Sequence, residues 1–111
     1  MATVYNIAVD QGSDYTTTIN LTDDAGANRN LTSFTARGQM KRNFSSTSNI
    51  AFTTAISNPT GGEVIISLSN AKTANLKYGR YVYDVELVNT GSGNVERILE
   101  GIVTVYPEVT K

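Results

Sequence analysis

The chain has 111 residues, of which 40% are apolar and 17% charged, and its formal net charge is −1. This composition excludes a disordered tail and a membrane protein, and the balanced charge offers no electrostatic footprint for nucleic acid or anionic lipid. Cysteine, histidine and tryptophan are absent, which excludes disulfides, thiolate chemistry, Cys/His zinc sites and imidazole acid–base catalysis. The length is right for one domain with one core, so we expect a single domain over residues 1–111.

The beginning of the chain lacks the basic start and the apolar run of a signal peptide. No apolar stretch approaches the roughly 20 residues that a membrane helix needs. We therefore expect a chain made in a cytoplasm, or one already trimmed, with no membrane partner.

The first half of the chain alternates apolar and polar residues with the period of half-buried strands. This pattern predicts a first strand over residues 4–9 and, after a turn at 10–13, a second strand over residues 15–21. A third strand is predicted over residues 31–42. Gly38 lies inside this strand, which indicates a bulge or a close backbone approach.

The middle of the chain continues the pattern after a polar loop at residues 43–49. A strand is predicted over residues 50–56, and an Asn-Pro-Thr-Gly-Gly turn at residues 58–62 ends it. The next strand covers residues 63–69, with alternate aliphatic residues on its core side.

Residues 69–76 are the one stretch with helical character, too short to be stable alone, so we expect a single turn that crosses between two sheets. A strand over residues 80–87 and a hairpin loop at 89–94 follow. The last strand is predicted over residues 95–105. Its apolar phase changes near Glu100 and Gly101, where we expect a bulge.

About seven strands separated by short turns, with almost no helix, predict an all-β protein. The arrangement favours an immunoglobulin-like antiparallel β-sandwich, with a small barrel as the alternative. Five aromatic residues fall on predicted inward faces and are expected in the core: Tyr15, Phe34, Phe52, Tyr81 and Tyr83.

Tyr81 follows Gly79 by two residues and opens a late strand, as does the tyrosine corner of immunoglobulin-like sandwiches. We expect its hydroxyl to bond a backbone group in residues 69–76. Tyr83 then occupies the place where antibody domains have their second cysteine.

No catalytic residues are predicted. Without histidine, a nucleophilic serine or threonine depends on Lys, Asp or Glu as its base, and no G-x-S-x-G elbow occurs. Asp10 and Asp14 bracket a turn, and Asp23 and Asp24 lie in a loop, so we interpret all four as turn formers.

No metal or other cofactor is predicted either. The loop at Asp23 and Asp24 lacks the spacing of an EF-hand, although two loops converging on one calcium ion remain an alternative there.

The candidate contact surface consists of basic and aromatic residues. Arg37 and Lys41 share the outward face of one strand, and Arg42 follows them, with Arg29 upstream. Alternatively, these basic residues are simply the solvent-exposed face of a strand, where charges also prevent pairing with another strand edge. Two tyrosines outside the core register complete the set: Tyr78 and Tyr106.

Several segments together resemble the small immunoglobulin-like domains of tailed-bacteriophage virion proteins, such as the N-terminal domain of baseplate upper proteins. The segments span nearly the whole chain and are residues 12–15, 30–40, 58–69, 79–85 and 97–105. The resemblance implies a sandwich that attaches to other virion proteins and has no catalytic residues.

We therefore expect a non-catalytic virion structural protein of the tail, baseplate or neck, made in the host cytoplasm and located in the virion. Its expected partners are other virion proteins, and in dilute solution we expect a monomer or a small cyclic oligomer. The alternative is a carbohydrate-binding or adhesin-type module that contacts a host surface.

Overall fold

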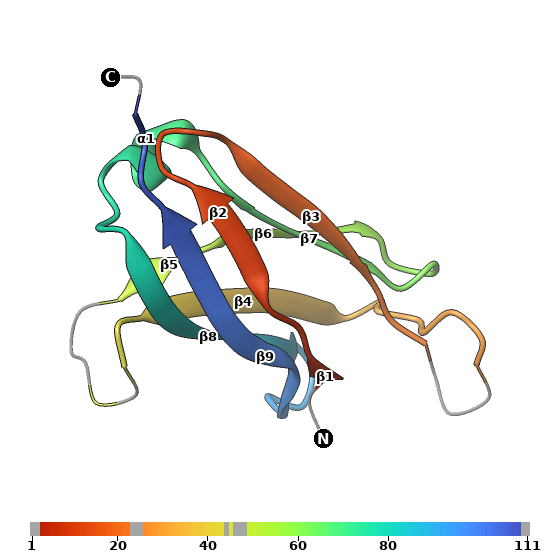
Figure 1. The fold of residues 1–111 in the computed structure, drawn as a ribbon. Coiled ribbons are helices and arrows are strands. Elements are labelled where there is room, and N and C mark those ends of the chain that lie inside the picture. Colours follow the sequence, from red (N-terminus) through yellow and green to blue (C-terminus); the bar gives the residue numbers. More distant parts are fainter. Residues whose placement is uncertain (1–2, 23–25, 44, 46–48, 110–111) are drawn as a thin grey trace.

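Two β-sheets pack face to face, and a short helix closes one end of the sandwich (Figure 1). The computed structural model describes residues 3–22, 26–43, 45 and 49–109. The large sheet contains β1 (Thr3–Val4), β2 (Ile7–Asp10), β4 (Phe34–Lys41), β5 (Ile50–Ala51), β8 (Gly79–Asn89) and β9 (Val95–Tyr106). The small sheet contains β3 (Tyr15–Asn20), β6 (Thr53–Asn58) and β7 (Glu63–Leu68), and the helix is α1 (Asn70–Ala74).

The order of strands is β1-β9-β8-β4-β5 in the large sheet, where β2 also pairs with β9, and β3-β7-β6 in the small sheet. Pairing is antiparallel except that β1 and β2 run parallel to β9. The predicted immunoglobulin-like β-sandwich is therefore confirmed. Among the described residues the strands exceed the expected seven because β1 and β5 are short additions of two residues each.

The predicted first strand over residues 4–9 is wrong in one respect, because it is interrupted at Tyr5 and Asn6. The Tyr5 carbonyl lies directly against Gly101 of β9, at the place that a Cβ atom would occupy. The Asn6 side chain accepts a hydrogen bond from the Ile102 N–H (3.1 Å), so a side chain replaces the backbone ladder here. The break thus follows from the close approach of two backbones.

The segment predicted as one strand over residues 50–56 instead belongs to both sheets. β5 pairs with β4 in the large sheet, and β6 pairs with β7 in the small sheet. Between them, the Phe52 N–H donates to the Gly38 carbonyl (2.9 Å). A Cβ on Gly38 would lie 3.1 Å from the Asp84 carbonyl, and the β4–β8 register is continuous. Gly38 therefore allows the neighbouring backbone of β8 to approach β4 closely, and the strand has no bulge at this position.

The predicted third strand begins later than expected, at Phe34 rather than residue 31. Its first residues form a turn in which the Phe34 N–H donates to the Leu31 carbonyl (3.0 Å) and Ser33 has a φ of 73°. Leu31 is nevertheless buried in the core.

The predicted bulge in the last strand lies at Ile98 and not at Glu100 and Gly101. The register changes from Val85 opposite Leu99 to Glu86 opposite Arg97, which leaves Ile98 unpaired. Ile98 and Leu99 are consecutive and both buried. Because the bulge adds one residue to β9, the residues before it point to the opposite face from the one that simple alternation predicts. Arg97 therefore lies on the outer face of the sheet.

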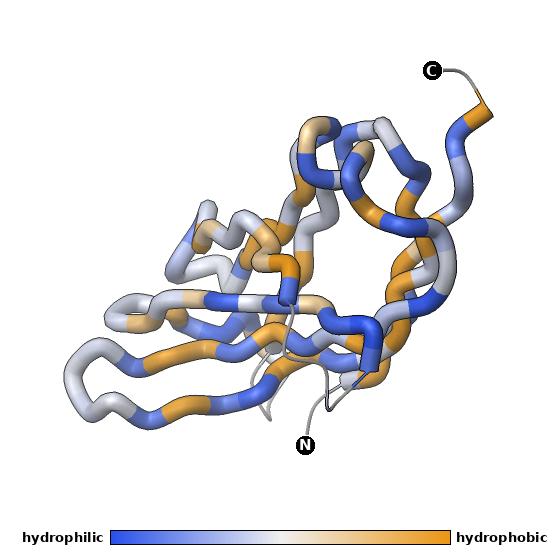
Figure 2. Tube along the Cα trace, turned by 90° about the vertical axis from the view of Figure 1, so that its left-hand side faces the viewer, coloured by the Kyte–Doolittle hydropathy of each residue, from blue (hydrophilic) through white to orange (hydrophobic). Residues whose placement is uncertain are grey.

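Hydrophobic and hydrophilic residues alternate along the strands (Figure 2). The buried apolar residues of both sheets form one hydrophobic core. Phe52, Tyr81 and Tyr83 are buried as predicted, and the Phe52 and Tyr83 rings meet edge to face with centroids 5.8 Å apart. Tyr15 and Phe34 pack against this core but are only partly buried.

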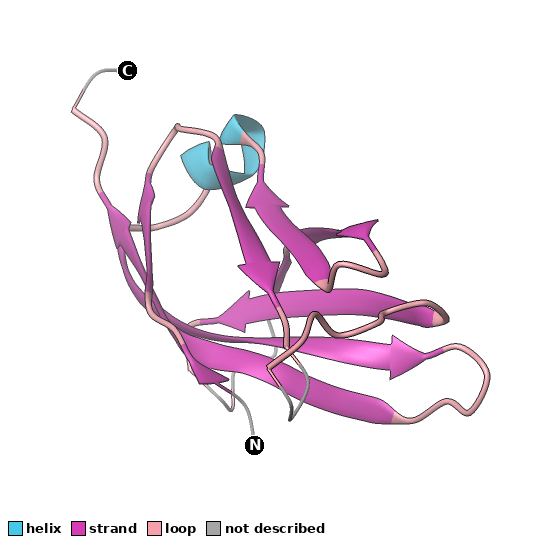
Figure 3. Ribbon diagram, turned by 90° about the vertical axis from the view of Figure 1, so that its right-hand side faces the viewer, coloured by secondary structure: helices cyan, strands magenta, loops and turns pink. Residues whose placement is uncertain are grey.

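The predicted helical crossing over residues 69–76 is confirmed, because α1 carries the chain from β7 in the small sheet to β8 in the large one (Figure 3). The Ser69 side chain caps it by accepting from the Lys72 N–H. The Tyr81 hydroxyl donates to the Lys77 carbonyl (2.8 Å), one residue beyond the predicted stretch, because the chain turns into β8 there. The expected role of Tyr81 is correct, and its expected acceptor is wrong.

Candidate functional site

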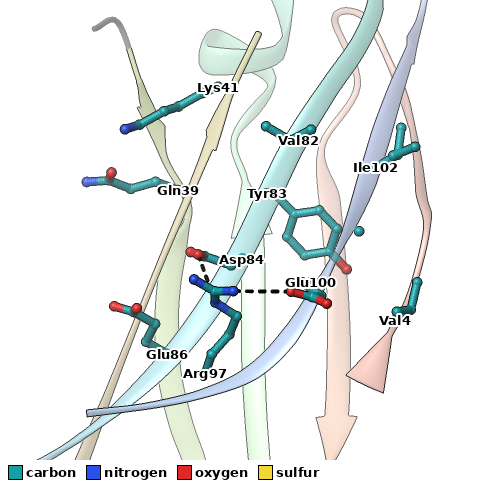
Figure 4. Close-up of a pocket in the computed structure, with 11 residues that line it drawn as sticks. Val4, Gln39, Lys41, Val82, Tyr83, Asp84, Glu86, Arg97, Glu100 and Ile102 are labelled. Carbon is teal, nitrogen blue, oxygen red and sulfur yellow. Dashed lines mark hydrogen bonds and ion pairs between the residues drawn. The ribbon is translucent and has the colours of Figure 1, made fainter. Parts of the chain in front are cut away.

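The outer face of the large sheet contains a hollow of about 580 Å³ over β1, β4, β8 and β9 (Figure 4). Most of its lining residues occupy outward positions on these strands. The buried Tyr83 of β8 and Gly101 of β9, which lie opposite each other, also line it. The lining residues are Val4, Gln39, Lys41, Val82, Tyr83, Asp84, Glu86, Arg97, Glu100, Gly101 and Ile102.

Two carboxylates face each other in the hollow, because Asp84 of β8 lies directly opposite Glu100 of β9. Like charges at opposite positions repel. Arg97 lies between them and reaches the Asp84 Oδ2 with its Nε and the Glu100 Oε2 with its Nη1, both at 3.3 Å. The Ile98 bulge therefore places the Arg97 guanidinium between Asp84 and Glu100, where it offsets the repulsion of their carboxylates.

Burial raises the pKa of Asp84 above its ordinary value of 3.8, and the nearby Glu86 raises it further, while Arg97 opposes both. Glu100 also raises this pKa and Lys41 lowers it, and the net direction is upward. Burial, the largest cause, therefore outweighs the two neighbouring cations at this carboxyl.

An apolar strip lies beside these charges. Val82 of β8 is directly opposite Ile102 of β9, and Val4 pairs with Glu100, two residues before Ile102. Val4 and Ile102 are 67% and 39% exposed. Aliphatic surface rimmed by charged side chains is typical of a protein-binding surface.

Two of the predicted contact residues lie on this face. Arg37 of β4 is directly opposite Glu86, and its Nε donates to the Glu86 Oε1 at 2.8 Å. Lys41 is directly opposite Val82 and lines the hollow. The outer face therefore carries both signs of charge, and the basic residues do not form a separate patch.

Arg42, the third predicted basic residue, faces the start of β8. Its guanidinium stacks on the Tyr81 ring at 4.7 Å and donates to the carbonyls of Tyr78 and Arg80. These contacts stabilise the position of Tyr81 at the tyrosine corner. Arg29, upstream, forms a two-pronged ion pair with Glu96 (2.6 and 2.8 Å).

Tyr78 and Tyr106 are 65% and 52% exposed, as expected of residues outside the core register. Gly79 pairs with Val105, so Tyr78, which precedes β8, and Tyr106, the last residue of β9, both lie at the helix end of the β8–β9 pair. They lie apart from the hollow, and the five predicted residues do not form one patch.

Sequence reasoning missed the acidic and aliphatic part of the hollow. The alternation in β8 places Val82, Asp84 and Glu86 outward, which could have identified them. The position of Arg97 could not be predicted, because it depends on where the bulge lies.

The chain also has one S-x-x-K spacing, at Ser69 and Lys72, in which a lysine could activate a serine. The Lys72 ammonium instead donates to the Ala51 carbonyl (2.7 Å), and the Ser69 hydroxyl accepts from a backbone N–H. Asp14 likewise accepts from the Asn70 N–H (2.7 Å), as a structural residue.

Within the described residues, no group of three or more acidic side chains could hold a metal ion. The alternative calcium site at Asp23 and Asp24 lies outside the described residues. The same part of the chain includes no helix with the length and hydropathy that a membrane crossing requires.

No protein-family model matches the sequence, and no curated protein matches it. Among solved structures, the chain is similar to InlP of Listeria monocytogenes, with a TM-score of 0.50 and 19% sequence identity. The match covers 95% of this chain and 28% of the InlP chain. At this identity the likeness supports the β-sandwich fold alone.

Proposed function

We propose that this chain is a non-catalytic structural protein of a phage virion, in the tail, baseplate or neck, and that it binds other virion proteins. The observation that carries the proposal is the outer face of the large sheet, where the aliphatic strip of Val4, Val82 and Ile102 borders the Asp84–Arg97–Glu100 group. The resemblance of nearly the whole sequence to small virion domains supports the same function.

The chemistry of this face suggests what a partner offers. An apolar side chain of the partner covers Val82 and Ile102, and a basic side chain approaches Asp84 and Glu100, two carboxylates that share Arg97. Such a contact is small, so the proposal depends on many copies that act together in a symmetric particle.

Immunogold labelling of purified particles, with mass spectrometry of their proteins, tests the location. The expected result is labelling of one part of the tail or neck, and antibody absorbed with the pure protein is the control. Absence of the chain from purified particles would refute the proposal.

The surface is tested by co-purification of tagged protein with the other virion proteins. Ile102→Asn should abolish the interaction, whereas Val95→Asn, at an exposed position (49%) far along the same strand, should leave it unchanged. A glycan array tests the adhesin alternative. Specific glycan binding without a virion partner would replace the proposed function.

A further inference from the structure

The free edge of β3 differs from the other strand edges of the sandwich. β3 pairs with β7 on one side, and within the described residues no strand pairs with its other side. β1 and β5 are edge strands of only two residues, and β2 is an edge strand of four residues that ends in the charged Asp10. β6 is bulged between Ile56 and Asn58 and followed by Pro59. β3 is six residues long and has no bulge, proline or charged residue.

The register identifies which backbone groups are free. The Leu21 N–H donates to the Gly62 carbonyl (2.9 Å), which continues the β3–β7 register by one step. Because hydrogen-bonded pairs alternate along an antiparallel ladder, the odd-numbered residues of β3 bond to β7. Thr16, Thr18 and Asn20 therefore direct their N–H and C=O groups away from β7, along the open edge.

Natural proteins protect such edges with charges, proline or bulges, and β3 has none of these. The inward side chains of β3 are also incompletely covered. Tyr15, Thr17 and Ile19 are partly exposed, whereas the core residues of neighbouring β7, Val64 and Ile66, are fully buried. Both the backbone and the inward face of β3 thus lack one neighbour.

We propose that β3 pairs antiparallel with β3 of a second copy of this chain, about a two-fold axis at Thr18. In this register Thr18 faces the partner's Thr18, and Thr16 faces the partner's Asn20. On the inward face, Tyr15 lies opposite the partner's Leu21, and Thr17 opposite the partner's Ile19. The pairing joins the two small sheets into one.

A second copy fits this edge because no charge opposes itself across the two-fold axis. Asp14, which precedes β3, accepts a hydrogen bond from the Asn70 N–H and faces the partner's Thr22 in this register. The apolar inward residues cover each other at the same time. The contact is one strand long, so it is smaller than a standard protein interface, and the dimer is weak. It is a closed contact, so it forms dimers and not filaments.

Sedimentation velocity of the pure protein tests the proposal, with concentrations from about 10 μM to about 1 mM. The expected result is a dimer fraction that rises with concentration. Thr18→Pro should abolish it, because this N–H points away from β7 and its loss leaves the β3–β7 ladder intact. The measurement uses the isolated protein, so its outcome is independent of the proposed virion function.

Charge reversal keeps the proposal testable if the proline variant fails to fold. Thr18→Lys and Thr18→Glu should each be monomeric, because each places like charges opposite each other, and their equimolar mixture should dimerise. Thr35→Lys adds the same charge to an exposed position of β4 and should dimerise like the natural protein. A protein that stays monomeric throughout, a dimer unaffected by Thr18→Pro, or a mixture that does not dimerise would overturn the proposal.

Discussion

Strands β3 and β8 have similar alternating patterns but different surroundings. Each carries a tyrosine at the start of its inward series, Tyr15 in β3 and Tyr81 in β8. β8 lies between β4 and β9, and its inward residues from Tyr81 to Leu87 are at most 6% exposed. β3 has one neighbour, and its inward residues remain partly exposed. A period-2 pattern therefore identifies the inward face of a strand, and the number of neighbouring strands decides how deeply that face is buried.

The largest expected difference between the two strands is in the cost of truncating an inward aliphatic side chain. Leu87→Ala in β8 should cost about 2–5 kcal/mol, because Leu87 is fully buried. Ile19→Ala in β3 should cost about 1–2 kcal/mol, because Ile19 is only partly buried and loses less transfer free energy. Urea unfolding at low protein concentration measures both. Equal losses would show that β3 is as well covered as β8.

The tyrosine corner should give the next largest effect. Tyr81→Phe should cost about 1–3 kcal/mol, because the Lys77 carbonyl loses its hydrogen-bond donor while the ring keeps its packing. Tyr106→Phe should cost only a few tenths of a kcal/mol, because Tyr106 is half exposed and water replaces the hydroxyl. Urea unfolding curves with unchanged m-values compare the two. Similar small losses would mean that the corner does not stabilise β8.

Two carboxylates, Glu96 of β9 and Asp84 of β8, should change the free energy of unfolding in opposite directions as the pH falls. Arg29 lowers the pKa of Glu96 from its ordinary 4.5, so this pair stabilises the fold at neutral pH and is lost as the pH falls through the lowered pKa. Glu96→Gln should cost about 0.5–1 kcal/mol at pH 7, and the cost should vanish in acid.

Asp84 should behave in the opposite way. Its pKa is raised, so its ionised form destabilises the fold, and this penalty is relieved as the pH falls through the raised pKa. Asp84→Asn should therefore leave stability at pH 7 unchanged or slightly higher, with no difference in acid. Unfolding free energies of both variants at several pH values provide the measurement, and a clear loss at pH 7 would show that the ion pair with Arg97 outweighs burial. β3 has no carboxylate and should add nothing to this pH dependence.

The smallest expected effect is that of metal removal. Asp23 and Asp24 follow β3 in the sequence, and a calcium ion bound by them would stabilise the folded protein. We expect the melting temperature to be the same with EDTA and with added calcium. A melting temperature more than a few degrees lower in EDTA would show that a bound metal ion stabilises the fold.

Most strands could be predicted from the sequence, because a strand with one solvent-exposed and one buried face alternates polar and apolar residues. The inward residues Val64, Ile66 and Leu68 of β7 and the capping of α1 by Ser69 are local features of this kind. The contact residues were harder to predict. Arg42 resembles a free surface cation in the sequence, but in the fold it stacks on Tyr81, which is 39 positions away.

The all-β class, the turns, the crossing helix and the inward face of each main strand follow from the order of the residues, because these features depend on near neighbours in the chain and on a period of two residues. The tertiary structure decided where strands break or change sheet. The close approaches at Gly38 and Gly101 and the bulge at Ile98 depend on backbones that meet across the sheets. Only these long-range contacts bring Asp84, Arg97 and Glu100 together on one face and leave the edge of β3 open.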